Sequence, residues 1–163
     1  MSDALLIAIQ GWEVRPWVER FRKAARHRDI RVWPDDVGNP ADIAYVAAWK
    51  PPHGLLMTFP NLQAVFSLGA GVDHLTTDVT LPDVPVARIV DRDLTHRMTD
   101  YIIMHTLMFH RKQRLYDKQQ RDLIWFEHEQ AAAKDVAVGV MGLGELGLDA
   151  IDRKSTRLNS SHT

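Results

Sequence analysis

A glycine-rich turn late in the sequence carries the most chemical information. The apolar run Val136–Met141 leads directly into Gly142-Leu-Gly144-Glu-Leu-Gly147. A strand, a glycine turn and a helix in this order are typical of a site for a dinucleotide such as NAD or NADP. The first glycine permits the tight turn, the second lets backbone approach a pyrophosphate, and the third lets helix pack on strand. The helix N-terminus then offers free N–H groups to the phosphates.

The residues after this turn predict an incomplete domain. Too few residues follow Gly147 to form the remaining strands of a dinucleotide-binding fold. Leu148 and Ile151 begin an apolar helical face, whereas the sequence from Asp152 onward is polar. Segment Asp152–His162 also matches a common sequencing adapter translated in one reading frame. We therefore interpret residues 152–163 as a non-native tail, with a polar disordered terminus as the plainer alternative.

Composition excludes several classes of protein. The hydrophobic fraction of 45% and charged fraction of 25% are ordinary for a globular chain. A net charge of −1 argues against a nucleic acid or an anionic membrane as partner. The absence of cysteine excludes disulfides and thiolate chemistry. The N-terminus does not resemble a signal peptide, and no stretch approaches the roughly 20 apolar residues that span a bilayer, so a cytoplasmic protein is expected.

Short apolar runs alternate with helical patterns through the first half of the chain. A helix is predicted over Val14–Arg26, and a single helical turn over Leu55–Phe59. Alternation of this kind predicts an α/β fold with a doubly wound parallel sheet. The strands are predicted at Ala4–Ile9, Ile30–Trp33, Ile43–Ala48, Ala64–Leu68 and Val86–Val90.

The second half begins with the longest helical pattern, Thr95–Arg114, for which Thr95 is the predicted N-cap. Such a helix could connect two domains. Leu115–Lys134 is polar with embedded apolar residues, which favours an extended arm or a partner surface.

Two loops that follow predicted strands could bind a ligand. Gly69-Ala-Gly71 is either a loop that needs positive φ or a nest of backbone N–H groups for a carboxylate. Trp49-Lys50 follows another strand, and its lysine is either a solvated loop charge or a ligand contact. Ligands collect at the carboxyl ends of strands in open α/β sheets, so two such loops on one edge reinforce each other.

The histidines do not predict a metal site. His105 and His110 are five residues apart on a predicted helix, which places them on different faces, and no carboxylate completes a ligand set. No nucleophile elbow or Ser/His/Asp arrangement is present. We expect scattered surface or capping histidines and no metal.

Four motifs in order resemble one family. They are Asp42–Pro52, Leu62–Asp73, the helix start Arg97–Tyr101 and the glycine turn Gly142–Gly147. Together they resemble the D-2-hydroxyacid dehydrogenase family, in particular its glyoxylate/hydroxypyruvate reductase A-like branch, over residues 4–151.

The resemblance implies a flavodoxin-like parallel-sheet substrate domain, followed by the first strand and glycine loop of a truncated Rossmann domain. The implied divisions are a substrate domain (residues 1–94), a connecting helix and arm (95–134), the start of the NAD(P)-binding domain (135–151) and the tail (152–163). The arm around Tyr116–Phe126 would form a homodimer in the full-length protein.

The resemblance also implies site residues. Met98 would pack near the nicotinamide end of NAD or NADP. The substrate loop residues would be Trp49, Lys50, Leu68, Gly69, Ala70 and Gly71. The pyrophosphate loop would be Gly142, Leu143, Gly144, Glu145, Leu146 and Gly147. The family's catalytic arginine, Glu/Asp and histidine are expected beyond the truncation, so no catalytic residue is assigned.

The implied reaction is reduction of glyoxylate or hydroxypyruvate by NAD(P)H, with this fragment itself inactive. In the family, a histidine paired with a carboxylate donates the proton, and an arginine binds the substrate carboxylate. Two alternatives stay open. One is a non-catalytic dinucleotide-binding or scaffold module, and the other is a polypeptide that arose in sequence assembly and has no biological role.

Overall fold

The computed structural model describes the backbone of residues 3–158 and the side chains of residues 3–152. Residues 159–163 of the predicted tail lie outside the described residues. The chain divides into a first unit, Met1–Val90, and a second unit, Asp91–Thr163. Each unit is described by itself.

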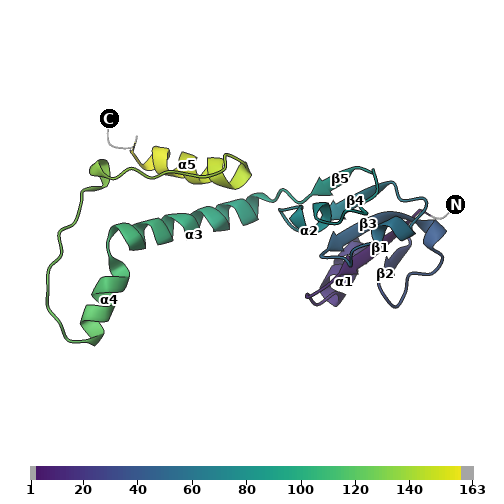
Figure 1. Ribbon diagram of the computed structural model, residues 1–163, viewed down its shortest axis with the longest axis horizontal. Helices are drawn as coiled ribbons and strands as arrows, with labels where there is room; N and C mark the ends of the chain where they lie inside the picture. Colours follow the sequence, from purple (N-terminus) through teal and green to yellow (C-terminus); the bar gives the residue numbers. More distant parts are fainter. Residues whose placement is uncertain (1–2, 159–163) are drawn as a thin grey trace. The chain divides into compact units, whose positions relative to one another are not determined.

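The first unit is built on a five-stranded parallel sheet (Figure 1). Its strand order is β2-β1-β3-β4-β5, which is the flavodoxin-like doubly wound order. The predicted α/β class and parallel sheet are therefore confirmed. The strands are β1 (Ala4–Ile9), β2 (Ile30–Val32), β3 (Ile43–Trp49), β4 (Ala64–Ser67) and β5 (Val86–Arg88).

Side chains of β1 alternate between two apolar clusters, because successive residues of a strand point to opposite faces. Leu5, Ile7 and Ile9 pack with Val18 of α1 (Arg15–Ala24). Ala4, Leu6 and Ala8 pack on the other face with residues that include Leu56, Phe59 and Leu75. All six residues of β1 are buried, as is typical of a strand covered on both sides.

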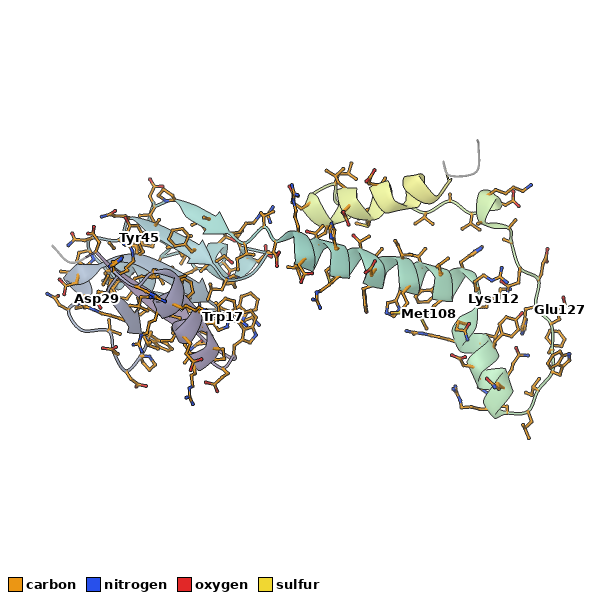
Figure 2. All side chains as sticks on the ribbon, turned by 180° about the vertical axis from the view of Figure 1, so that it is seen from behind. Trp17, Asp29, Tyr45, Met108, Lys112 and Glu127 are labelled. Atoms are coloured by element: carbon orange, nitrogen blue, oxygen red, sulfur yellow. The ribbon has the colours of Figure 1, made fainter. Side chains whose placement is uncertain are left out.

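Short helices supply the cover on the second face. They are the 3₁₀ turn η2 (Leu56–Thr58) and the helical turn α2 (Asp73–Thr76), while the 3₁₀ turn η1 (Pro40–Asp42), which leads into β3, buries no residue. Leu56 and Leu75, from η2 and α2, are almost wholly buried. Figure 2 shows Trp17 on α1, the longer helix of this unit.

The second unit is helical in its described part. Its elements are α3 (Arg92–His110), α4 (Gln113–Arg121), η3 (Ala133–Asp135) and α5 (Glu145–Leu158), and α5 packs along α3 (Figure 1). The predicted N-cap at Thr95 is wrong. The Asp91 carboxylate caps α3 by accepting from Asp93 N–H at 3.0 Å. Thr95 lies one turn inside, where its hydroxyl donates to the Asp91 carbonyl.

The predicted arm is helical first and irregular afterwards. Helix α4 takes up Gln113–Arg121, and the chain beyond it, which carries Glu127 in Figure 2, forms no regular element before η3. This segment is tied back to α4, because the Tyr116 hydroxyl accepts from the His128 N–H at 3.2 Å.

The predicted strand Val136–Met141 does not form a strand. Val136 has extended backbone angles, but no described strand of the second unit pairs with this segment. A strand is defined by hydrogen bonds to a neighbour, and the apolar pattern alone does not supply one. Helix α5 in turn runs through Asp152 to Leu158, further than the polar sequence predicted, since arginine, lysine and leucine favour helix.

Among the described helices, none combines the length and the apolar character required to cross a bilayer.

Candidate functional site

The carboxyl ends of four strands meet at one edge of the first unit's sheet. The parallel register places Ile9 beside Trp49, Ala48 beside Ser67, and Ser67 beside Arg88. The residues that follow these strands therefore share an edge. The structure thus brings the two predicted loops, Trp49-Lys50 and Leu68–Gly71, to the same edge, where open α/β sheets bind ligands.

Gly69 is held against the indole of Trp49. A Cβ added at residue 69 would lie 2.4 Å from Trp49 Cζ3, a distance that forces one of the two groups to move. Gly71 is less constrained, since a Cβ there would meet Asp73 Oδ2 at an ordinary 3.5 Å. Neither glycine has positive φ. The predicted need for positive φ is therefore wrong, and close approach to Trp49 is the reason for glycine at position 69.

The buried hydroxyl of Ser67 fixes the shape of this loop. Ser67 Oγ lies 2.8 Å from the Gly71 carbonyl and 3.1 Å from the Gly69 carbonyl, and it accepts from Gly69 N–H at 3.2 Å. Leu68 N–H donates to the Ala48 carbonyl at 2.9 Å. Two of the four predicted amides are therefore used inside the fold. In the described part of the chain, this leaves Ala70 and Gly71 to offer N–H groups to a ligand.

Two cationic side chains accompany the loop. Lys50 has φ of 47°, a left-handed conformation that a non-glycine residue adopts rarely and that often marks a functional position. Its ammonium nitrogen lies 5.6 Å from the centroid of the Trp49 ring. Arg88, at the end of β5, lies with Nη1 3.4 Å from the Ala70 carbonyl. Both charges favour an anion at this edge.

Sequence reasoning missed Arg88 and three aromatic residues of this edge. Trp12 follows β1 and stacks on Trp49, with ring centroids 4.0 Å apart and planes 15° apart. Trp17 lies nearly parallel to Trp12 at 6.0 Å, and His74 of α2 tilts against Trp49 at 4.8 Å. Trp12 and His74 had a signal in the sequence, since each is an aromatic side chain shortly after a predicted strand or glycine loop. Trp17 lies within the predicted helix, and Arg88 lies within the predicted strand.

The loop that follows Lys50 is anchored by Asp78. Its carboxylate accepts from Gly54 N–H at 2.9 Å, from Thr80 N–H at 2.9 Å and from the Thr80 hydroxyl at 2.6 Å. These hydrogen bonds stabilise the ionised carboxylate and therefore hold the pKa of Asp78 below its usual value. The hydrogen bond from the Thr80 hydroxyl is the largest cause of this lowering.

The glycine turn of the second unit has the predicted geometry in two respects. Gly142 has φ of 90°, so it occupies the left-handed region that the tight turn requires. A Cβ at Gly147 would lie 2.0 Å from the Gly142 carbonyl oxygen, so only glycine fits there. Nothing lies within 4 Å of a Cβ at Gly144, which keeps the backbone of the turn open to a ligand.

These residues fit a dinucleotide pyrophosphate, because the open turn leads into the N-terminus of α5. Glu145, in the first turn of α5, adds a negative charge at that end and partly opposes a bound anion. Leu143 is exposed and Leu146 is half-buried, so their side chains do not close the turn.

Met98 lies on α3, beside a residue that contacts α5. It is half-buried, and its neighbour Thr99 is fully buried and donates its hydroxyl to Asp149 of α5 at 2.5 Å. His96 lies 3.9 Å from the same carboxylate. The position of Met98 near a nicotinamide stays a prediction.

Among residues 3–152, whose side chains are described, no group of three histidine or carboxylate side chains could hold a metal ion. His105 packs on Tyr101 of the same helix, at 4.2 Å between ring centroids, and His110 ends α3.

Known proteins with a similar sequence include a reductase. No protein-family model matches the chain. Over 142 residues it is 31% identical to glyoxylate/hydroxypyruvate reductase A of Yersinia enterocolitica, in a match that covers 83% of this chain and 45% of that protein. The chain is a homologue of this reductase and of proteins named D-isomer specific 2-hydroxyacid dehydrogenases. The predicted resemblance is therefore confirmed.

Solved structures agree with this relationship. A D-isomer specific 2-hydroxyacid dehydrogenase from Xanthobacter autotrophicus, in complex with NADPH and MES, is 34% identical with a TM-score of 0.82. The match covers 92% of this chain and 49% of that chain. A probable 2-hydroxyacid dehydrogenase from Rhizobium etli, with NADP, HEPES and tartaric acid, is 36% identical with a TM-score of 0.82, over 96% of this chain and 50% of that chain.

A third structure is an NADPH-dependent glyoxylate/hydroxypyruvate reductase from Sinorhizobium meliloti, in complex with NADP and sulfate. It is 33% identical with a TM-score of 0.80, over 95% of this chain and 50% of that chain. The chain thus spans about half the length of the relatives it matches.

Proposed function

We propose that the carboxyl edge of the first unit's sheet binds the carboxylate of a small 2-oxoacid. The complete protein would reduce that acid, glyoxylate or hydroxypyruvate, to the 2-hydroxy acid with NADPH or NADH. The observation that carries this proposal is the convergence of the Trp49-Lys50 and Leu68–Gly71 loops at one edge of a sheet with the 2-1-3-4-5 order. The homologous reductases and their NADP(H) complexes support it.

The chemistry of this edge suits a carboxylate. The N–H groups of Ala70 and Gly71 would donate to its oxygens, and Lys50 and Arg88 would add positive potential. Trp49 would form an apolar wall beside the loop, because its ring already lies against Gly69. Ser67 holds the loop in this shape through its buried hydroxyl.

The cofactor would be held by the turn Gly142–Gly147, with Met98 near its nicotinamide end. When bound, the cofactor supplies the hydride. The protein contributes the open backbone at Gly144 and the N-terminus of α5, to which the pyrophosphate would bind.

We expect the 163-residue chain to be inactive by itself. Reduction of a carbonyl requires substrate and nicotinamide to be held in contact, with an acid that protonates the developing alkoxide. In the described residues of the second unit there is no sheet to carry a nicotinamide, and the edge of the first unit supplies binding groups only. Measurable oxidation of NADPH with glyoxylate by the purified chain, free of host reductases, would contradict this expectation.

Two binding measurements test the proposal on the chain as it exists. Oxamate, an unreactive analogue of a 2-oxoacid, should shift the backbone amide resonances of Ala70 and Gly71 in NMR titration. Gly144→Val should abolish any weak binding of NADPH, since the new side chain would fill the open turn, whereas the exposed Leu143→Ala should preserve it. Oxamate shifts that appear elsewhere, with residues 68–71 unmoved, would argue against the carboxylate loop.

We further propose the domain divisions at residues 94, 134 and 151, a cytoplasmic location, and a homodimer through the arm around Tyr116–Phe126 of the complete protein.

The genomic sequence beyond codon 151 tests the reductase assignment. A reading frame that continues into an arginine, a carboxylate and a histidine supports the enzyme. A frame without them favours a binding module or an assembly product.

A further inference from the structure

Trp12 has an unusual position for a large aromatic residue. Its exposed fraction is 42%, and it belongs to neither of the two apolar clusters that stabilise the sheet. Its ring contacts are instead with other indoles, closely with Trp49 at 4.0 Å and more distantly with Trp17 at 6.0 Å. Burial in the core therefore does not account for the residue.

Trp49 is the ring through which Trp12 can act on the candidate site. Trp49 lies so close to Gly69 that no side chain fits between them. Any tilt of this indole therefore changes the space available to the Gly69 backbone. His74 contacts the same indole from α2, in a tilted arrangement at 4.8 Å. The positions of Trp49 and of the glycine loop are thus mutually dependent.

The backbones beneath these rings are also joined. Gln10 N–H donates to the Trp49 carbonyl at 2.9 Å, immediately after β1 ends. Trp12 follows two residues later, so the stack rests on a fixed connection between β1 and β3. Parallel, closely spaced indoles on such a base have few ways to reorient without losing their contact.

We infer that Trp12 is a positioning residue for the carboxylate loop. It holds Trp49 against Gly69 and thereby sets the orientation of the Ala70 and Gly71 N–H groups. The expected effect of Trp12 on ligand affinity rests on the proposed function. Its structural part, the coupling of Trp12 to the loop amides, is independent of any ligand.

The test compares four forms of the full chain: unsubstituted, Trp12→Ala, Trp12→Phe and Phe66→Ala. Trp12→Phe retains a ring that can stack. Phe66 is a matched control because it is 41% exposed, lies on β4 of the same sheet and pairs with Tyr45. Four measurements apply to each form: the exciton signal of stacked indoles in circular dichroism, the amide resonances of Ala70 and Gly71, the affinity for oxamate, and the urea midpoint.

We expect Trp12→Ala to lose the exciton signal, to shift both amide resonances and to weaken oxamate binding about threefold to tenfold, the range that one aromatic pair supplies. Trp12→Phe should restore most of the affinity. Phe66→Ala should lower the urea midpoint at least as much as Trp12→Ala, yet leave the amides and the affinity unchanged. A purely structural role for Trp12 would not produce this separation.

Unmoved Ala70 and Gly71 resonances in Trp12→Ala, with the exciton signal lost, would overturn the inference. Failure of the proposed function has a different signature, because the unsubstituted chain would then show no oxamate shift at residues 68–71. In that case the ligand-free amide shifts alone still decide whether Trp12 positions the loop.

Discussion

The two units of the chain differ in what their apolar side chains contact. In the first unit, residues of β1, β3 and β4 are buried in clusters on both faces of the sheet. In the described part of the second unit, Ala150 is the one apolar residue that is buried. Large side chains there are exposed, including Leu107, Phe109 and Met141. An apolar pattern becomes a core only when a second layer covers it.

The same difference explains why one of two similar apolar segments forms a strand and the other does not. Ala4–Ile9 and Val136–Met141 are both rich in apolar residues. The first became β1 because β2 and β3 lie on either side of it. The second has no described partner, and Val138 and Val140 are exposed. Exposed apolar surface of this extent is typical of a region that contacts further protein.

The largest expected effect is on the core of the first unit. Leu6→Ala removes a fully buried side chain, so it should lower the free energy of unfolding by about 2–5 kcal/mol. Leu148→Ala, the matched change in the second unit, removes a side chain that is 55% exposed and should cost less than about 0.5 kcal/mol. Urea denaturation followed by circular dichroism measures both. Equal losses would contradict the contrast between the units.

A smaller effect is expected at the glycine loop. Gly69→Ala should lower the free energy of unfolding by about 1–3 kcal/mol, because its Cβ would overlap Trp49. Gly71→Ala is the control, since its Cβ would make only an ordinary contact. Urea midpoints and the Trp fluorescence spectrum of each variant give the answer. A Gly71→Ala change as costly as that at Gly69 would refute the close-approach explanation.

The second unit should respond to loss of its buried hydrogen bond. Thr99→Val keeps the volume of the side chain but removes the donor to Asp149, at a cost of about 1 kcal/mol. The measurement is hydrogen exchange of the α5 amides, which should become several times faster while those of β1 are unchanged. Thr106→Val is the control, because the Thr106 hydroxyl donates only to the Ile102 carbonyl within α3. Faster exchange in β1 would show that the units do not respond separately.

The smallest effect depends on pH and is lost in acid. The pKa of Asp78 is lowered in the folded state, so its ionised form contributes stability above the unfolded-state value of about 4, and this contribution is lost as pH falls through the folded pKa. Asp78→Asn should therefore be less stable than the parent at neutral pH, and the difference should shrink below about pH 4. Thermal unfolding across this range measures it. A difference that does not change with pH would refute the assignment to the ionised carboxylate.

Local sequence patterns located most elements of the first unit. The buried run Ala4–Ile9 has the predicted bounds, and β3 extends one residue beyond the predicted Ala48 to Trp49. Loop positions were also predictable, because a strand that ends at a glycine or at Trp49-Lys50 must present those residues at its carboxyl end. The second unit was predicted less well. Val136–Met141 failed as a strand, and Asp91 rather than Thr95 caps α3.

The sequence by itself determined the α/β class, the glycine turn at Gly142–Gly147 and the loops that could hold a carboxylate, because these depend on local conformation and periodicity. Only the tertiary structure decided which amides are free. Ala48 takes the N–H group of Leu68 as a result of strand register, and Ser67, buried by the fold, takes that of Gly69 within the loop. It also decided that Trp12 and Trp49, far apart in the chain, stack on each other. The physical reason is that parallel strands bring distant residues to one edge, and no local pattern encodes which partner each residue meets there.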